Sequence, residues 1–152
     1  MTADFDIVVI GAGPVGASTA ALLAHHSGVA PARIALPAPE LATITAAAGS
    51  DAGAPAHARV APPELRVAAL SRASEQILRH AGAWDHLPQA RVCAYERMCV
   101  WHAAVPADSV AALRFDAAEL AEPNLGYIVE NRALANAALA SFRERGGAVL
   151  AT

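Results

Sequence analysis

The chain has no lysine. All 11 basic residues are arginines scattered along the sequence, and the formal net charge is −3. Domains that bind nucleic acid carry a basic patch or stripe on one face. The absence of any basic cluster therefore argues against a nucleic-acid partner.

Cysteine is nearly absent as well. Cys93 and Cys99 lie six residues apart, with no CxxC pair and no matching pair of histidines. This pattern excludes a zinc-finger type of metal site and a disulfide framework. We predict no metal site, and the low cysteine count favours a reducing, cytoplasmic setting.

Long apolar runs and large side chains are also lacking. No stretch reaches the length of about 18 apolar residues that a membrane-spanning helix needs. The N-terminal residues MTADFD carry acids where a signal peptide has basic residues. The hydrophobic fraction is 55%, but 41 of the 152 residues are alanine and only seven are aromatic. The length suits one domain, or one domain and the start of another.

What the sequence does contain is a glycine motif between two short apolar segments. Residues 4–10 predict a strand, GAGPVG follows at 11–16, residues 17–26 predict a helix ending before Gly28, and 33–36 predict a second strand. In a βαβ unit, Gly11 permits the tight turn, Gly13 lets a pyrophosphate approach, and Gly16 lets helix and strand pack closely. The motif therefore predicts dinucleotide binding at the helix N-terminus.

One part of that motif is missing. An Asp or Glu that binds the ribose is expected after the second strand, near Ala38, and the nearest acid is Glu40, beyond two prolines. Residues 38–63 are rich in Ala, Gly, Pro, Ser and Thr and predict a long flexible loop.

The later elements alternate between helix and strand. A helix is predicted over 71–81, capped by Ser71 or Ser74, with Ala73, Ile77 and Leu78 on one face. Strands are predicted around 95–102 and 112–117, joined as an antiparallel pair, and again at 126–130 and 148–152. The remaining helix is predicted over 131–145, with Asn131 as its N-cap.

Four segments together resemble a known family. They are ELRVAALSRASEQILRHAGAW (64–84), YERMCVW (95–101), LRFDA (113–117) and LGYIVENRALANAAL (125–139). In this order they resemble the FAD-dependent hydroxylases of ubiquinone biosynthesis, which are aromatic-ring monooxygenases of the para-hydroxybenzoate hydroxylase type.

The resemblance implies a cofactor and its ligands. Gly11, Gly13 and Gly16 would hold the ADP part of FAD, with Arg66 and Arg132 also close to the cofactor. It implies NAD(P)H as co-substrate and a polyprenylated phenol or quinone precursor as substrate. The protein would be cytoplasmic, with peripheral attachment to the inner membrane or to a biosynthetic complex left open. No catalytic residue can be assigned.

The expected fold class is α/β, with a Rossmann-like FAD-binding βαβ start and a partial antiparallel substrate-side sheet. Residues 1–37, 64–94 and 126–152 would form the FAD-binding part, and 95–125 the start of the substrate-side segment. Members of the family are more than twice as long, so the sequence is expected to be an N-terminal portion without hydroxylase activity of its own. Two alternatives remain: an NAD-linked dehydrogenase domain, and a non-catalytic dinucleotide- or partner-binding module.

Overall fold

A parallel sheet forms one end of the molecule. The computed structural model describes residues 4–38 and 64–150. The sheet has the order β1-β2-β8, and its strands are β1 (Ile7–Val8), β2 (Ile34–Pro37) and β8 (Ala148–Leu150). Both strand pairs are parallel. Helix α1 (Pro14–His26) and the short 3₁₀ turn η1 (Pro31–Arg33) connect β1 to β2, so the predicted βαβ unit is present.

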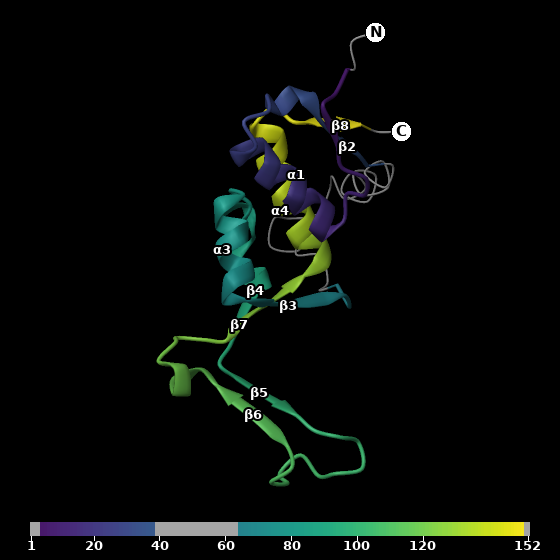
Figure 1. Ribbon diagram of the computed structural model, residues 1–152. Coiled ribbons are helices and arrows are strands. Elements are labelled where there is room, and N and C mark those ends of the chain that lie inside the picture. Colours follow the sequence, from purple (N-terminus) through teal and green to yellow (C-terminus); the bar gives the residue numbers. More distant parts are fainter. Residues whose placement is uncertain (1–3, 39–63, 151–152) are drawn as a thin grey trace, which may run out of the picture.

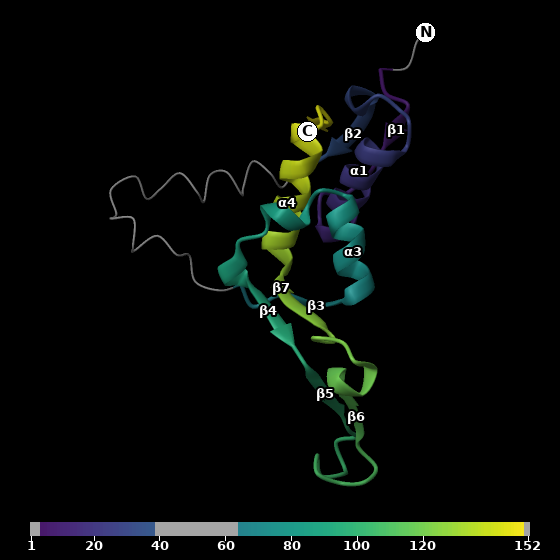
Figure 2. The same cartoon turned by 90° about the vertical axis from the view of Figure 1, so that its left-hand side faces the viewer.

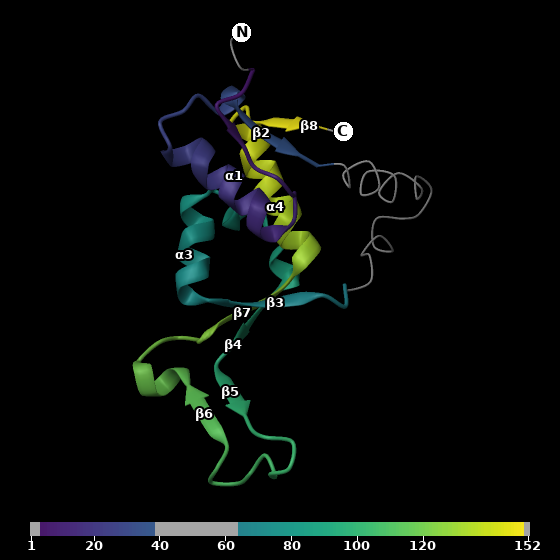
Figure 3. The ribbon, with the colours of Figure 1, turned by 45° about the vertical axis from the view of Figure 1, so that its right-hand side comes forward.

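Two helices lie side by side against this sheet. Helix α4 (Asn131–Glu144) precedes β8 and packs along α1, and both helices begin on the side away from the parallel sheet (Figures 1 and 3). Their contact is built largely from alanine, including Ala17, Ala20 and Ala138, all fully buried. Small side chains let the helix axes approach closely. Larger fully buried side chains are few: Phe142, Ile34, Leu36 and Val129.

A second, antiparallel sheet lies beyond the start of α4. Its order is β3-β7-β4, and its strands are β3 (Val67–Ser71), β7 (Gly126–Glu130) and β4 (Val92–Tyr95). We predicted β7 but neither β3 nor β4. Both are short and carry alanine, which has no preference for a strand. Their strand conformation comes from pairing with β7 on either side.

The predicted antiparallel pair is present as a separate hairpin. Strands β5 (Arg97–Val100) and β6 (Leu113–Asp116) pair with each other, and the hairpin extends away from both helices (Figures 1 and 2). The 3₁₀ turn η5 (Ala117–Leu120) leads from β6 back toward β7. The predicted loop over 38–63 lies outside the described residues except for Ala38, which is buried.

Helix α3 (Arg72–His80) begins where the sequence predicted, with Ser71 as N-cap. Two further 3₁₀ turns, η3 (Trp84–His86) and η4 (Gln89–Arg91), lead from it to β4. The predicted apolar face of α3 is wrong. Of Ala73, Ile77 and Leu78, only Leu78 is buried, and Ile77 is 52% exposed.

Glu75 takes the other buried place on α3. Its carboxylate accepts hydrogen bonds from Arg72 and Arg79, three residues before it and four after it on the same helix. A buried carboxylate needs such paired donors. The apolar pattern alone could not reveal this pairing, and it therefore assigned the buried face to the wrong side chains.

Candidate functional site: an open helix N-terminus after a glycine loop

The backbone geometry requires glycine at two of the three glycine positions in the loop. Gly11 has φ of +97°, a conformation that L side chains rarely adopt. A Cβ on Gly16 would lie 1.8 Å from the carbonyl oxygen of Gly11, so α1 can start this close to the loop only with glycine there. At Gly13, a Cβ would meet no described atom within 4 Å. The described protein therefore gives no packing reason for Gly13, and the space beside it is open.

The N-terminus of α1 carries no side-chain cap. Gly13 is the N-cap residue, Pro14 follows at the first helical position, and the first turn contains no acidic residue. The first intrahelical bond of this turn runs from the Ala17 amide to the Gly13 carbonyl, at 2.9 Å. The preceding N–H groups of Val15 and Gly16 lie in the part of a helix that has no intrahelical acceptor. Such a terminus favours an anion.

The other two α-helices in the described part of the chain, α3 and α4, are capped by side chains. At α3, Ser71 Oγ accepts from the amide of Ser74 at 3.2 Å. At α4, Glu64 Oε2 accepts from the amide of Arg132 at 2.9 Å, although Glu64 lies 68 residues earlier. The prediction of Asn131 as N-cap is wrong: Glu130 occupies the N-cap position and makes no capping bond with its own side chain.

Asn131 has a different environment. Its amide N–H donates to the carbonyl of Arg66 at 3.0 Å. Its side-chain Oδ1 is buried and has no hydrogen-bond partner in the structure. A buried acceptor without a donor is costly, and it marks a place where a bound group can supply one. No sequence pattern indicates this, because burial at the first turn of α4 depends on β3.

The two predicted arginines are neighbours through the backbone but not through their guanidinium groups. Arg66 precedes β3 and Arg132 lies in the first turn of α4, linked by the bond between Arg66 and Asn131. Both side chains are exposed, and in residues 4–38 and 64–150 neither guanidinium has a hydrogen bond or ion pair.

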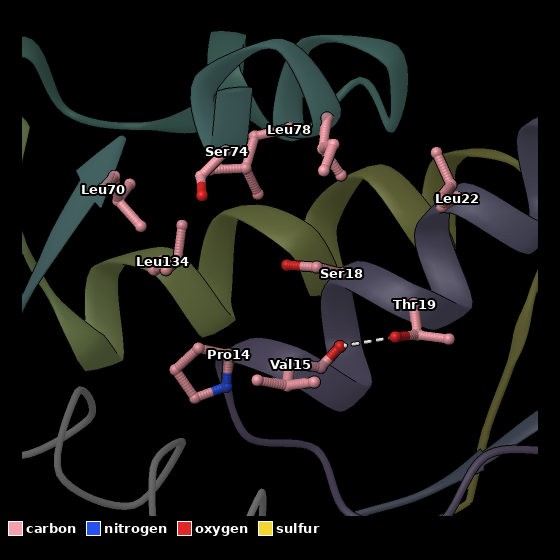
Figure 4. Close-up of a pocket in the computed structure, with 10 residues that line it drawn as sticks. Pro14, Val15, Ser18, Thr19, Leu22, Leu70, Ser74, Leu78 and Leu134 are labelled. Atoms are coloured by element: carbon pink, nitrogen blue, oxygen red, sulfur yellow. Dashed lines mark hydrogen bonds between the residues drawn. The ribbon is translucent and has the colours of Figure 1, made fainter. Parts of the chain in front are cut away.

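Two separate hollows adjoin the start of α4. Arg132 lines one of about 300 Å³, shared with Arg91, Glu130 and Asn136. Pro14 and Val15 of α1 line the other, about 260 Å³, together with Leu134 (Figure 4). The hollows share no lining residue. The structure thus places Arg132 on a different side of α4 from the first turn of α1.

The groove in Figure 4 is apolar. Its walls are α1, α3, the end of β3 and the first turn of α4, and the polar groups on it are the hydroxyls of Ser18, Thr19 and Ser74. Thr19 donates to the carbonyl of Val15 at 2.9 Å. No titratable side chain lines it. This groove therefore offers no general acid or base.

An ion pair between Arg91 and Glu130 helps to hold Glu64, the cap of α4, in place. Arg91 donates to Glu130 Oε1 at 2.6 Å, and the amide of Glu64 donates to Glu130 Oε2 at 3.2 Å. The Arg91 hydrogen bond, followed by the Glu64 amide, lowers the pKa of Glu130 below its ordinary value. Glu130 stays charged at neutral pH and holds Glu64 against the start of α4.

The acid expected after β2 is not at the predicted place. Ala38 follows β2, is buried, and donates its amide to the carbonyl of Leu150 at 2.8 Å. Glu40 lies outside the described residues. Arg33, just before β2, pairs with Asp6, which lies before β1. Asp6 therefore holds the positive charge of Arg33 at the start of the strand rather than at its end.

Within residues 4–38 and 64–150, no group of three or more His, Cys, Asp or Glu side chains could hold a metal ion. Within the same ranges, no helix combines the length and the apolar character needed to cross a membrane.

Sequence comparison finds relatives over most of the chain, although no family model matches it. The 3-demethoxyubiquinol 3-hydroxylase of Escherichia coli K12 is 34% identical over 133 residues, covering 87% of this chain and 28% of the relative. The mitochondrial ubiquinone biosynthesis monooxygenase COQ6 of Rattus norvegicus is 31% identical over 137 residues, covering 88% of this chain and 24% of the relative. The chain thus spans about a quarter of the length of these relatives.

Comparison with solved structures finds proteins of similar fold. The ternary complex of aklavinone-11 hydroxylase with FAD and aklavinone aligns over 99% of this chain and 26% of its own, with a TM-score of 0.58 and 22% identity. This likeness shows the fold. In sequence and in fold, the chain is thus similar to the FAD-dependent aromatic-ring monooxygenases.

Within that class, the sequence relatives are the hydroxylases of ubiquinone biosynthesis, and this is the group that the chain resembles. The resemblance predicted from the four sequence segments is therefore confirmed.

Proposed function

We propose that this chain is the ADP-binding, N-terminal part of an FAD-dependent hydroxylase that resembles those of ubiquinone biosynthesis. The observation that carries the proposal is the open N-terminus of α1, directly after a glycine loop in a parallel βαβ unit. We interpret β1, α1 and β2 as a Rossmann-like start. The similarity to these hydroxylases supports FAD as the group that this terminus takes.

The described residues fit such a group. Gly13 leaves space beside the helix N-terminus, where the pyrophosphate would lie, and Gly11 and Gly16 hold the loop against α1. Asn131 offers a buried oxygen that lacks a donor. Arg66 presents an exposed guanidinium before β3, a group that suits phosphate oxygens. Arg132 is the weaker candidate, because its side chain lines the other hollow.

FAD, when bound, supplies the redox chemistry. The residues of this chain bind and orient it: the N–H groups of α1 face the phosphates, and the α1–α4 contact fixes the direction of that terminus. We propose NAD(P)H as co-substrate and a polyprenylated phenol or quinone precursor as substrate, by analogy with the 3-demethoxyubiquinol 3-hydroxylase and the ubiquinone biosynthesis monooxygenase. Peripheral attachment to a membrane or complex belongs to the same proposal.

The hairpin fits the start of a substrate-side sheet. One face of β5 and β6 carries Met98, Val100, Leu113 and Phe115, which are 43–62% exposed. The other face carries Arg97 and Asp116, which form an ion pair. A two-stranded ribbon with an uncovered apolar face is stabilised only by further packing. We therefore propose that residues 95–125 join a larger sheet, and that residues 4–38, 64–94 and 126–150 belong to the FAD-binding part.

Ligand titration tests the proposal and its alternatives. We expect FAD and ADP to bind the chain, measured by flavin fluorescence and by calorimetry, and NAD to bind more weakly than FAD. Gly13→Ala should remain folded, because its Cβ meets no described atom, and should lose at least about tenfold in affinity since the methyl group takes up the phosphate space. Gln76→Ala, an exposed change on α3, is the control.

Preference for NAD would favour the dehydrogenase alternative. Undiminished binding by Gly13→Ala would show that the nucleotide does not bind at the start of α1.

A further inference from the structure

Helices α1 and α4 begin side by side, so two helix N-termini lie next to each other. Pro14 and Val15 of α1 and Leu134 of α4 line a single groove (Figure 4). Each terminus carries partial positive charge and N–H groups that have no acceptor within their own helix. On these grounds alone, an anion could bind at either helix start.

The N-terminus of α4 is already occupied by a carboxylate of the protein. Glu64 Oε2 takes the Arg132 amide at 2.9 Å, and the Arg66 carbonyl takes the Asn131 amide at 3.0 Å. The segment just before β3 thus supplies acceptors for two successive N–H groups of α4.

This carboxylate is held firmly in place. The backbone amide of Glu64 donates to Glu130, and Glu130 is fixed in turn by Arg91. The Cα atoms of Val67 and Glu130 are partners in the β3–β7 ladder, which sets the distance between the segment and the helix. Glu64 is therefore part of the sheet-to-helix junction, whereas α1 has no side-chain cap and no acid in its first turn.

We propose that Glu64 determines which helix takes the phosphates of the nucleotide. Its carboxylate fills the place that an anion would occupy at α4 and repels a second negative charge from it. The pyrophosphate is thereby directed to α1. This role rests on the proposed function for its ligand, but the exclusion of anions from α4 can be measured without the nucleotide.

The test follows individual backbone amides by ¹⁵N NMR of the whole chain. The probes are ADP and inorganic phosphate, each at constant ionic strength, with the wild type, Glu64→Ala and Glu64→Gln. In the wild type, ADP should shift the amides of Val15 and Gly16 and leave Arg132 unmoved.

In Glu64→Ala, inorganic phosphate should shift the Arg132 amide, with an apparent affinity about fivefold higher than in the wild type. Glu64→Gln is the matched control. Its side chain still offers an oxygen to the Arg132 amide, so phosphate should leave that amide unmoved.

The outcomes separate the two ideas. If ADP shifts the amides of Val15 and Gly16 but phosphate does not shift the Arg132 amide in Glu64→Ala, the nucleotide site stands and the role of Glu64 is overturned. If phosphate shifts the Arg132 amide in Glu64→Ala while ADP shifts no amide of α1, the exclusion by Glu64 stands and the proposed function fails.

Glu64→Ala loses a helix cap and could unfold. In that event phosphate, but not chloride at equal ionic strength, should restore a dispersed spectrum because it replaces the missing carboxylate. Equal effects of the two anions would overturn the proposal.

Discussion

The first turns of α1 and α4 lie next to each other, and the two helices have nearly equal lengths, but their N-termini are capped differently. Glu64, from a distant part of the chain, covers α4, whereas α1 begins at a bare glycine followed by proline. Helix α3 resembles α4 in this respect, since Ser71 caps it. In the described part of the chain, the one long helix without a side-chain cap is the one that follows the glycine loop.

The open start costs α1 stability that the capped starts of α3 and α4 retain. A side-chain cap contributes about 1 kcal/mol to a helix. Leaving α1 without one is costly unless a ligand supplies the acceptors. Substitutions at and beside these helix starts test the contrast.

Gly16→Ala should have the largest effect. Its Cβ would sit 1.8 Å from the Gly11 carbonyl oxygen, so the loop and α1 must separate. Overpacking of this kind costs about 3 kcal/mol, because backbone rather than a flexible side chain has to move. Urea unfolding followed by circular dichroism measures the loss. Gly13→Ala is the control, and equal stability of the two variants would contradict the explanation of the glycine spacing.

Leu134→Ala should come next. Leu134 is buried in the first turn of α4 and lines the groove that Pro14 and Val15 also line. Truncation of a buried leucine costs about 2 kcal/mol or more, and here it also loosens the alignment of the two helix starts. The exposed Leu113 on β6 is a matched control, for which Leu→Ala should cost under about 0.5 kcal/mol. Similar losses at both positions would refute the assignment of Leu134 to the core.

Ser71→Ala tests a covered helix start directly. The change removes the acceptor for the Ser74 amide and should lower the free energy of unfolding by about 1 kcal/mol. Gln76→Ala on the same helix should leave the free energy of unfolding unchanged. No loss in Ser71→Ala would mean that side-chain caps contribute little in this protein, and the contrast with α1 would lose its energetic meaning.

The smallest effect is expected at the opposite ends of α1 and α4. His25 contacts Ser141 Oγ at 3.2 Å, and Ser141 donates to the Ala81 carbonyl at 2.6 Å. Arg145 lies 3.2 Å from His25 Nε2 and 3.0 Å from His25 Nδ1 and can only donate, so His25 must keep one ring nitrogen unprotonated to accept from it. Burial first, then the charges of Arg145 and His26, lowers the pKa of His25.

Because the folded-state pKa of His25 lies below the unfolded value of about 6.5, the unfolded chain takes up the proton first as pH falls. The stability contributed by neutral His25 is therefore present above that value. It is lost as the pH falls toward the lowered folded pKa. Partial exposure keeps the loss under about 1 kcal/mol.

Urea unfolding at pH 7.5 and pH 5.0 should show this fall in the wild type and a smaller one in His25→Gln. His102→Gln, on the exposed hairpin, should titrate like the wild type. An identical pH dependence in all three proteins would show that His25 does not cause the loss of stability at low pH.

Much of the fold could be predicted because its signals are local. The glycine turn, the two parallel strands, the cap at Ser71 and the β5–β6 hairpin all follow from neighbouring residues. The misses share a cause. Strands β3 and β4 exist through pairing with β7, and Glu75 is buried because two arginines neutralise it. Neither pairing leaves a periodic pattern in the sequence.

The same division applies to the candidate site. The glycine spacing and the family resemblance could be read from the sequence, because backbone turns and motif order depend on adjacent residues. Which helix start remains open depends on the tertiary structure. Glu64 and Arg132 are 68 positions apart, and only the pairing of β3 with β7 brings that carboxylate to α4. A cap supplied from so distant a residue forms only when the sheet is packed, so no local pattern could predict it.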